Sequence, residues 1–308
     1  MRWEGIAVDR PGPGEVLVRN VAIGLNFIDV YHRSGLYPVP LPFTPGMEGA
    51  GVVELPGPGV KEFKPGDRVA YSGPIGAYAE LLLRPAERLV KLPPGISEKT
   101  AAAAMLKGLT AWYLLRKTFK VSRGQAILVH AAAGGVGQLL CQWARKLGAV
   151  VIGTVGSDEK AGLAFKAGCR EVIVMSREDL VSRVKKITKG AGVPVVYDGI
   201  GKATFEGSLD CLAPRGLLVS FGNASGPVPP VDIGLLSRKG SLYLTRPSLQ
   251  NYTASRADLL AGARELFSAV KNGFLKIRGD QSYPLSEAAK AHRDLEARKT
   301  TGSTLLLP

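Results

Sequence analysis

The chain has 308 residues, enough for about two domains that each bury a core of their own. Its 45% apolar and 21% charged residues are typical of a folded globular protein and exclude a low-complexity chain. No run of about 18 apolar residues occurs, and Glu4 and Asp9 interrupt the N-terminus before a signal-peptide core could form. We therefore expect a cytoplasmic enzyme or binding protein without a membrane segment.

The cysteines and histidines are few and scattered. Cys141, Cys169 and Cys211 form no CxxC pair, so the sequence predicts a reducing compartment and neither a disulfide framework nor a thiolate zinc site. The histidines stand far apart in the sequence, and we expect structural rather than catalytic roles for His32, His130 and His292.

The formal net charge is +14, and the excess lies in the middle of the chain. Residues 109–246 carry 19 basic and 9 acidic side chains, whereas residues 1–108 carry 12 and 11. A segment that holds a polyphosphate would show this bias, and so would a generally basic surface. Charge alone leaves both readings open.

Residues 1–108 predict short strands separated by Gly/Pro turns such as Pro11-Gly12-Pro13-Gly14. This pattern is typical of an all-β, barrel-like domain. The strand candidates are 15–21, 51–54, 67–71 and 78–83.

Strands and helices alternate from about residue 125 to residue 246, as a parallel doubly wound sheet requires. Six strands are predicted, at 126–131, 150–155, 171–174, 194–198, 217–221 and 241–245. Helical patterns lie between them at 136–147, 160–167, 178–188 and 204–212. We expect a six-stranded α/β Rossmann sheet in a dinucleotide-binding domain over residues 109–246.

The last 62 residues, 247–308, are too few for a third domain. Apolar positions at helical spacing predict one helix over 259–270, and a second helix over 286–298 precedes a terminal strand at 302–307. We expect this tail to return to residues 1–108 and complete a substrate domain.

The segment 127–137 combines a buried strand, a Gly-rich turn and a helix start. Gly134 and Gly135 can adopt backbone angles closed to other residues and let a diphosphate approach the main chain, while Gly137 lets the helix pack close to the strand. From Val136 onward the helix N-terminus offers N–H donors and a positive dipole end. A purely structural tight turn is the alternative.

The residues after the second strand bear on the choice of cofactor. NAD enzymes place an acid at this strand end to bind the ribose 2′-hydroxyl, but this strand ends in Thr154-Val155-Gly156-Ser157. Asp158 and Glu159 are typical of the first turn of the next helix, and Lys160 could meet a 2′-phosphate. The pattern favours NADP(H) over NAD(H).

Several ordered segments resemble the medium-chain dehydrogenase/reductase superfamily and, within it, the zeta-crystallin-like NADPH:quinone oxidoreductases. The resemblance covers nearly the whole chain and implies a β-rich GroES-like domain beside the Rossmann domain. The segments that carry it are 24–31, 33–38, 45–52, 107–111, 131–137 and 220–223.

The zinc-dependent branch of this superfamily has Gly-His-Glu where this chain has Gly46-Met47-Glu48, together with an early catalytic cysteine and a four-cysteine lobe. Residues 1–140 contain no cysteine. A thioether cannot replace these ligands, so zinc is excluded. The resemblance then implies direct hydride or electron transfer from the nicotinamide in an interdomain cleft.

By the same resemblance, Asn26 would orient the nicotinamide or a substrate carbonyl, Tyr31 and Tyr37 would line a quinone pocket, and Thr110 would sit at the nicotinamide. Each has a plainer alternative. The tyrosines could simply pack in the core with their hydroxyl groups hydrogen-bonded. Asn26 could make a local hydrogen bond in a turn, and Thr110 could cap the start of a helix.

The resemblance also implies that Ser157 and Lys160 contact the 2′-phosphate, and that Arg298 contacts the phosphate end of the cofactor. For the two cations, a solvated surface position is the alternative. Met175 stands where the family has a tyrosine near the adenosine phosphate, which removes a hydroxyl donor. The residues implied at the nicotinamide half are Phe221, Gly222 and Asn223.

These observations predict an NADPH-dependent quinone reductase. An NADPH-dependent alkenal or enone reductase shares the fold, the cofactor and the loss of zinc, and is the nearer alternative. A protein that binds RNA through its basic middle domain is an alternative of a different class. The resemblance further implies a homodimer formed by pairing of the last sheet strand, near 241–246.

Overall fold

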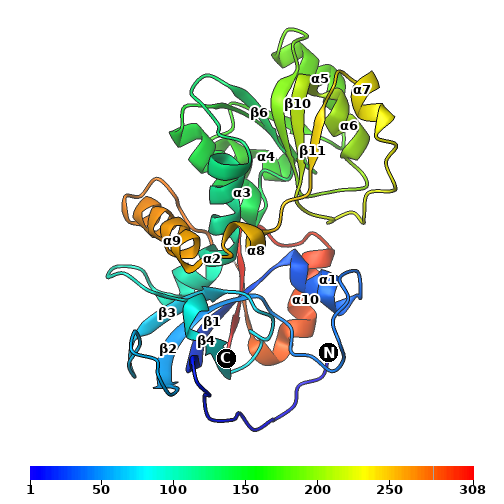
Figure 1. Cartoon of the computed structure of the whole chain (residues 1–308). Coiled ribbons are helices and arrows are strands. Elements are labelled where there is room, and N and C mark those ends of the chain that lie inside the picture. Colours follow the sequence, from blue (N-terminus) through cyan, green and yellow to red (C-terminus); the bar gives the residue numbers. More distant parts are fainter. Residues whose placement is uncertain (280) are drawn as a thin grey trace. The chain divides into compact units, whose positions relative to one another are not determined.

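The computed structural model describes residues 1–279 and 281–308 and divides into two compact units. Unit 1 comprises Met1–Leu109 and Thr253–Pro308, and unit 2 comprises Thr110–Tyr252. In Figure 1, unit 1 is drawn in blue, cyan, orange and red, and unit 2 in green and yellow. None of the helices in these described ranges is long and apolar enough to span a bilayer.

Unit 1 is built on one seven-stranded sheet, in the order β12-β13-β1-β2-β3-β5, with β4 paired to β1. The long strand β1 lies antiparallel to β2, β4 and β13. Buried side chains of Val16, Val18 and Ile23 from β1 form part of the core of this unit. The strands are β1 (Glu15–Leu25), β2 (Glu48–Pro56), β3 (Arg68–Ser72), β4 (Leu81–Pro85), β5 (Leu89–Lys91), β12 (Gln281–Pro284) and β13 (Thr304–Leu307).

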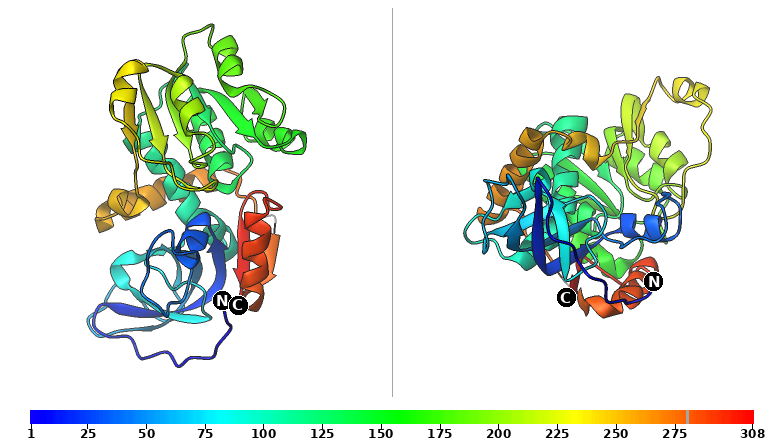
Figure 2. Two further views of the ribbon diagram at one scale, coloured as in Figure 1. Left: turned by 90° about the vertical axis from the view of Figure 1, so that its right-hand side faces the viewer. Right: turned by 60° about the horizontal axis from the view of Figure 1, so that its bottom comes forward.

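The C-terminal tail completes this sheet, which confirms the expectation. β13 places Leu306 opposite Ile23 of β1, and β12 runs parallel to β13. Figure 2 shows the blue and red segments from two further sides. The strands β5 and β12, of three and four residues, were not predicted.

Three helices belong to unit 1, namely α1 (Phe27–Arg33), α9 (Arg256–Lys271) and α10 (Ala288–Glu296). A fourth, α2 (Glu98–Tyr113), begins in unit 1 and ends in unit 2 and was not predicted as a helix. Its residues Ala101–Ala104 and Met105 are all buried. From Ala101 to Tyr113 the helix has no exposed residue and therefore no polar stripe, so this part of the sequence lacks the periodicity by which helices are recognised.

Unit 2 contains the predicted six-stranded sheet, in the order β11-β10-β9-β6-β7-β8, and its neighbouring strands run parallel to one another. The fold class is therefore confirmed. The chain order reverses between β6 and β9, where doubly wound sheets bind ligands at their carboxyl ends. The strands are β6 (Ala126–Val129), β7 (Val150–Val155), β8 (Glu171–Val174), β9 (Val193–Asp198), β10 (Leu212–Ser220) and β11 (Tyr243–Thr245).

The helices of unit 2 pack on this sheet. Leu180, Val184, Phe205 and Leu209 come from α5 and α6 and share one buried core with strand residues such as Leu128. Figure 1 labels these elements. The helices are α3 (Gly135–Lys146), α4 (Asp158–Lys166), α5 (Leu180–Ile187), α6 (Phe205–Asp210), α7 (Gly234–Arg238) and α8 (Leu249–Tyr252).

Candidate functional site

The Gly-rich turn joins β6 to α3 and does not use the backbone angles expected of it. Gly134 is the N-cap of α3 with φ −78° and ψ 171°, which any residue can adopt, and Gly135 is the first helical residue. The left-handed conformation in this turn belongs instead to Ala131, with φ 51°. The expectation that Gly134 and Gly135 adopt backbone angles closed to other residues was wrong.

Space is the reason for Gly137. A Cβ atom there would lie 2.2 Å from the carbonyl oxygen of Ala131 and 2.9 Å from Cα of Ala132. This confirms that Gly137 lets α3 pack close to the strand turn. No side chain caps α3, and its first N–H groups, from Gly135 and Val136 onward, have no acceptor within the helix. A bare helix N-terminus of this kind fits a diphosphate.

The ends of β7 and β8 lie side by side, because the Met175 N–H donates to the Val155 carbonyl at 2.9 Å. Ser157 is the N-cap of α4, with Asp158 and Glu159 in its first turn as predicted. The Asp158 carboxylate binds Arg177 at 2.8 Å. This strand end therefore presents a serine, a methionine and the nearby half-buried Lys160.

Phe221, Gly222 and Asn223 follow β10. The Phe221 N–H donates to the Asp198 carbonyl at 2.8 Å, and a Cβ on Gly222 would lie 2.4 Å from the Gly199 carbonyl oxygen. Arg246 Nη1 donates to the Gly222 carbonyl at 3.0 Å. Because the strands are parallel, this segment, the Gly-rich turn, Ser157 and Met175 all lie at the same edge of the sheet.

Beneath this edge lies a buried polar network that was not predicted. His130 Nε2 lies 2.9 Å from Ser208 Oγ, which donates to Asp198 Oδ2 at 3.0 Å. Burial lowers the pKa of His130, although the charge of Asp198 opposes the shift. Serine stands between histidine and aspartate here, whereas a hydrolase triad needs histidine in the middle. The network therefore joins β6, β9 and α6, and His130 is structural.

Asn26 of unit 1 is buried between β1 and α1. Its amide nitrogen donates to the Gly24 carbonyl at 3.1 Å and to Glu48 Oε2 at 2.9 Å. Both amide hydrogens are thereby committed, so only the amide oxygen, an acceptor, can meet a ligand. Such an oxygen can accept from the amide of a nicotinamide but cannot donate to a quinone carbonyl.

Tyr31 and Tyr37 contact each other edge to face, with ring centroids 5.1 Å apart. The Tyr37 N–H donates to the Tyr31 carbonyl at 3.1 Å, which fixes the loop after α1 against the helix. Thr110 is buried near the C-terminal end of α2, so the helix-start alternative for this residue was wrong. Arg298 is an exposed residue of unit 1 that follows α10 with φ 58°.

The buried ion pair of Glu48 and Lys107 was missed. Lys107 Nζ donates to Glu48 Oε2 at 3.2 Å and to the Leu25 carbonyl at 3.2 Å. Glu48 Oε1 accepts from the Leu106 N–H at 2.6 Å. Glu48 therefore ties β1, β2 and α2 together behind Asn26. The sequence signal for this buried pair was a charged residue within an apolar stretch, Gly46-Met47-Glu48-Gly49-Ala50.

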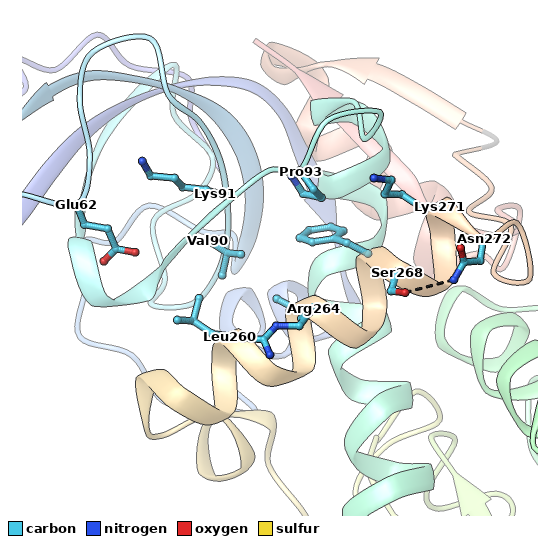
Figure 3. A pocket seen from close by; sticks show the side chains of 11 residues that line it. Glu62, Val90, Lys91, Pro93, Leu260, Arg264, Ser268, Lys271 and Asn272 are labelled. Carbon is cyan, nitrogen blue, oxygen red and sulfur yellow. Dashed lines mark hydrogen bonds between the residues drawn. The ribbon is translucent and has the colours of Figure 1, made fainter.

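A cavity of about 530 Å³ lies along α9 of unit 1, beside β5 and Pro93 (Figure 3). Val90, Leu260 and Phe267 contribute apolar surface, and Lys91 and Lys271 contribute charge. None of the predicted site residues lines this cavity. It therefore plays no part in the assignment of the site.

Comparison with known proteins decides the family. Residues 12–94 match the alcohol dehydrogenase GroES-like domain family, and residues 135–261 match the zinc-binding dehydrogenase family. Over 300 residues the chain is 59% identical to a quinone oxidoreductase from Pseudomonas aeruginosa, with 97% of this chain and 92% of that protein covered. The chain belongs to the quinone oxidoreductase family.

Other members of the quinone oxidoreductase family and its neighbours agree in fold. The structure of the Escherichia coli quinone oxidoreductase complexed with NADPH matches with a TM-score of 0.97 at 51% identity, covering 99% of this chain and 95% of that one. A 2-haloacrylate reductase from Burkholderia sp is 48% identical over 318 residues, covering 99% of this chain and 94% of that protein. The resemblance found in the sequence is thereby confirmed.

In residues 1–279 and 281–308, no group of three or more His, Cys, Asp or Glu side chains is placed to hold a metal ion. Cys141 and Cys169 lie with their sulfur atoms 3.4 Å apart and are free thiols in the interior of unit 2. Met47 is buried next to Glu48.

Proposed function

We propose that this protein reduces quinones with NADPH by hydride or electron transfer that needs no metal. The observation that carries this proposal is the uncapped N-terminus of α3, where Gly137 lies too close to the backbone of Ala131 and Ala132 to bear a side chain. The family relationship supports it. When bound, NADPH supplies the reducing equivalents. The test follows NADPH oxidation with a benzoquinone and a naphthoquinone. Absence of turnover with both at saturating NADPH would refute the proposal.

We assign unit 2 to the cofactor and unit 1 to the quinone. The domains predicted for these roles were 109–246 and 1–108 with 247–308, so residue 109 and residues 247–252 fall in the other unit. Gly134–Gly137 would receive the diphosphate, and Phe221, Gly222 and Asn223 the nicotinamide half. Asn26 would accept from the nicotinamide amide, with Thr110 nearby, and Tyr31 and Tyr37 would stack against the quinone. Arg298 would approach the phosphate end of the cofactor.

The 2′-phosphate is assigned to Ser157 and Lys160, beside Met175. Replacing Lys160 with alanine removes a charge-assisted contact worth about 1.5–3 kcal/mol. We expect the Kd of NADPH to rise at least about tenfold and that of NADH to change little. Fluorescence titration of both cofactors measures this. Equal weakening of NADPH and NADH would show that Lys160 does not contact the 2′-phosphate.

Reduction of activated alkenes is the second candidate, and the 48% identity to a 2-haloacrylate reductase favours it. Both reactions use the same cofactor site, so the structure of unit 2 does not separate them. Product analysis after incubation with NADPH and an α,β-unsaturated ketone does. Efficient saturation of the C=C bond, without quinone turnover, would establish this candidate in place of the first.

A homodimer built through β11 is also proposed. β11 is the edge strand of the unit 2 sheet, and its Tyr243 and Leu244 are 62% and 38% exposed. Pairing with a second copy would satisfy the open backbone groups of this edge. Tyr243→Lys should convert a dimer to a monomer in sedimentation experiments, because two lysines would then face each other. Leu41→Lys, at an 83% exposed position of unit 1, is the control.

We propose a cytoplasmic location, supported by the three free, buried cysteines, which suit a reducing compartment. Cell fractionation with an antibody to the chain tests it, and recovery in the membrane or secreted fraction would contradict it.

A further inference from the structure

Behind Asn26 lies a buried carboxyl group that no step of the proposed reaction uses. Asp29, in the first turn of α1, is completely buried. Its Oδ2 accepts from the Asn26 backbone N–H at 2.9 Å and from the Tyr78 hydroxyl at 3.1 Å. Oδ1 is buried without a partner among the described residues. Asp29 therefore holds the residue that we assign to the nicotinamide.

Tyr78 extends this contact to α10. Its hydroxyl oxygen lies 2.9 Å from Nε2 of His292, which is also completely buried. A phenol has one proton to donate. When Asp29 is ionised, Tyr78 donates to it and His292 Nε2–H donates to Tyr78. When Asp29 is protonated, it can donate to Tyr78, which then donates to Nε2 of the other His292 tautomer, whose proton is on Nδ1. The ionisation of Asp29 thus reverses the direction of both hydrogen bonds of the Tyr78 hydroxyl.

Of Asp29, Tyr78 and His292, Asp29 is the group whose pKa lies near neutrality. Burial raises the pKa of Asp29 to about 7, against the hydrogen bonds from Asn26 and Tyr78 and the charge of Lys107, while Glu48 adds to the rise. Burial, assisted by Arg33 and the N-terminal ammonium group, lowers the pKa of His292 to about 4, against Glu296.

The titratable and charged groups around Asp29 and His292 come from several elements. Lys107 comes from α2, Glu48 from β2 and Tyr78 from the loop before β4. Arg33 of α1 and Glu296 of α10 form an ion pair with N···O 2.6 Å on the His292 side. Lys107 is committed to Glu48, and among the described residues no cation contacts the Asp29 carboxyl directly.

We propose that Asp29 is a positioning residue whose ionisation fixes Asn26 for quinone reduction and so couples the rate to pH. The inference rests on the proposed function. Ionised Asp29 holds the Asn26 N–H by a charge-assisted hydrogen bond and favours the N-terminus of α1. Protonated Asp29 accepts more weakly, and Asn26 is then held less firmly.

The first test compares pH profiles of kcat and KM for wild type and Asp29→Asn between about pH 5 and 9. We expect kcat/KM of the wild type to rise about tenfold through pH 7, since a charged acceptor binds about 1.4 kcal/mol more strongly than a neutral one. Asp29→Asn should lose the step and stay at the low plateau. Asp232→Asn, at an exposed carboxylate of unit 2, should keep the wild-type profile.

A second variant shifts the midpoint without removing the carboxyl group. Tyr78→Phe deletes a donor that stabilises ionised Asp29, so the midpoint should move to higher pH. This variant keeps the proposal testable if Asp29→Asn does not fold. An unmoved midpoint in Tyr78→Phe, or a step retained in Asp29→Asn, would overturn the proposal.

The third measurement needs no cofactor. Because the pKa of Asp29 in the folded protein lies above its unfolded value of 3.8, the folded state binds the extra proton between these values. Asp29 therefore costs the wild type stability as pH rises from about 4 to about 7, whereas His292, whose pKa is lowered to about 4, contributes in the opposite direction in both proteins. The stability of wild type in urea should thus fall relative to that of Asp29→Asn over this range. The same pH dependence in both proteins would refute the ionisation. Absence of quinone turnover at every pH would instead refute the proposed function, and the coupling with it.

Discussion

Replacing Gly137 with valine should remove NADPH binding. The new Cβ would lie 2.2 Å from the Ala131 carbonyl oxygen and 2.9 Å from Cα of Ala132. Both are backbone atoms of the turn between β6 and α3, so relief requires the turn and the helix N-terminus to separate. Losing even two charge-assisted hydrogen bonds to the diphosphate weakens binding at least about 100-fold. Overpacking should also cost about 1–3 kcal/mol of unfolding free energy.

Fluorescence titration with NADPH and urea unfolding measure the two effects separately. Gly162→Ala is the matched control, because a Cβ at that position, within α4, meets no atom within 4 Å. It should leave the Kd unchanged and stabilise the protein by about 0.5–1 kcal/mol, as alanine favours a helix over glycine. A Gly137→Val variant that is folded and binds NADPH normally would contradict the assignment of the diphosphate to this turn.

Replacing Glu48 with alanine should destabilise the protein by about 3–5 kcal/mol. Glu48 and Lys107 are both buried, and the substitution leaves the ammonium group without its counter-charge. The N–H of Leu106 and the amide of Asn26 lose their acceptor as well. Urea unfolding at neutral pH measures the loss, which should be accompanied by reduced quinone turnover because Asn26 is no longer anchored.

Two comparisons isolate the buried charge. The double variant Glu48→Ala/Lys107→Met should recover part of the lost stability, because it no longer buries an unpaired cation. Asp232→Asn breaks an exposed ion pair with Arg238 and should change stability by less than about 1 kcal/mol. If Glu48→Ala cost no more than Asp232→Asn, the buried pair would have no role in holding β1, β2 and α2 together.

The parallel sheet of unit 2 was predictable because its signals are local. Strands β7 and β8 were predicted with their observed bounds, 150–155 and 171–174, since a buried strand reads as a short apolar run. Asp158 and Glu159 were placed correctly in the first turn of α4. In each case a few neighbouring residues suffice to set the structure.

Other features could not be inferred from neighbours. The glycines of the turn after β6 were predicted to adopt backbone angles closed to other residues, but the left-handed residue is Ala131, and Gly137 is required by the close approach of α3. Thr110 was given a helix-start alternative because α2 has no exposed residue from Ala101 to Tyr113 and so shows no amphipathic pattern there. Packing decided both outcomes.

By itself, the sequence determined the two kinds of domain, the glycine corner and the absence of early cysteine ligands, because each depends on residue type and short spacing. Only the tertiary structure decided that Glu48 would pair with Lys107, and that Asp29 would reach His292 through Tyr78. Tyr78 and His292 are 214 residues apart in the chain. Burial next to distant partners sets the charge of these groups, and no local pattern encodes which partners the fold will supply.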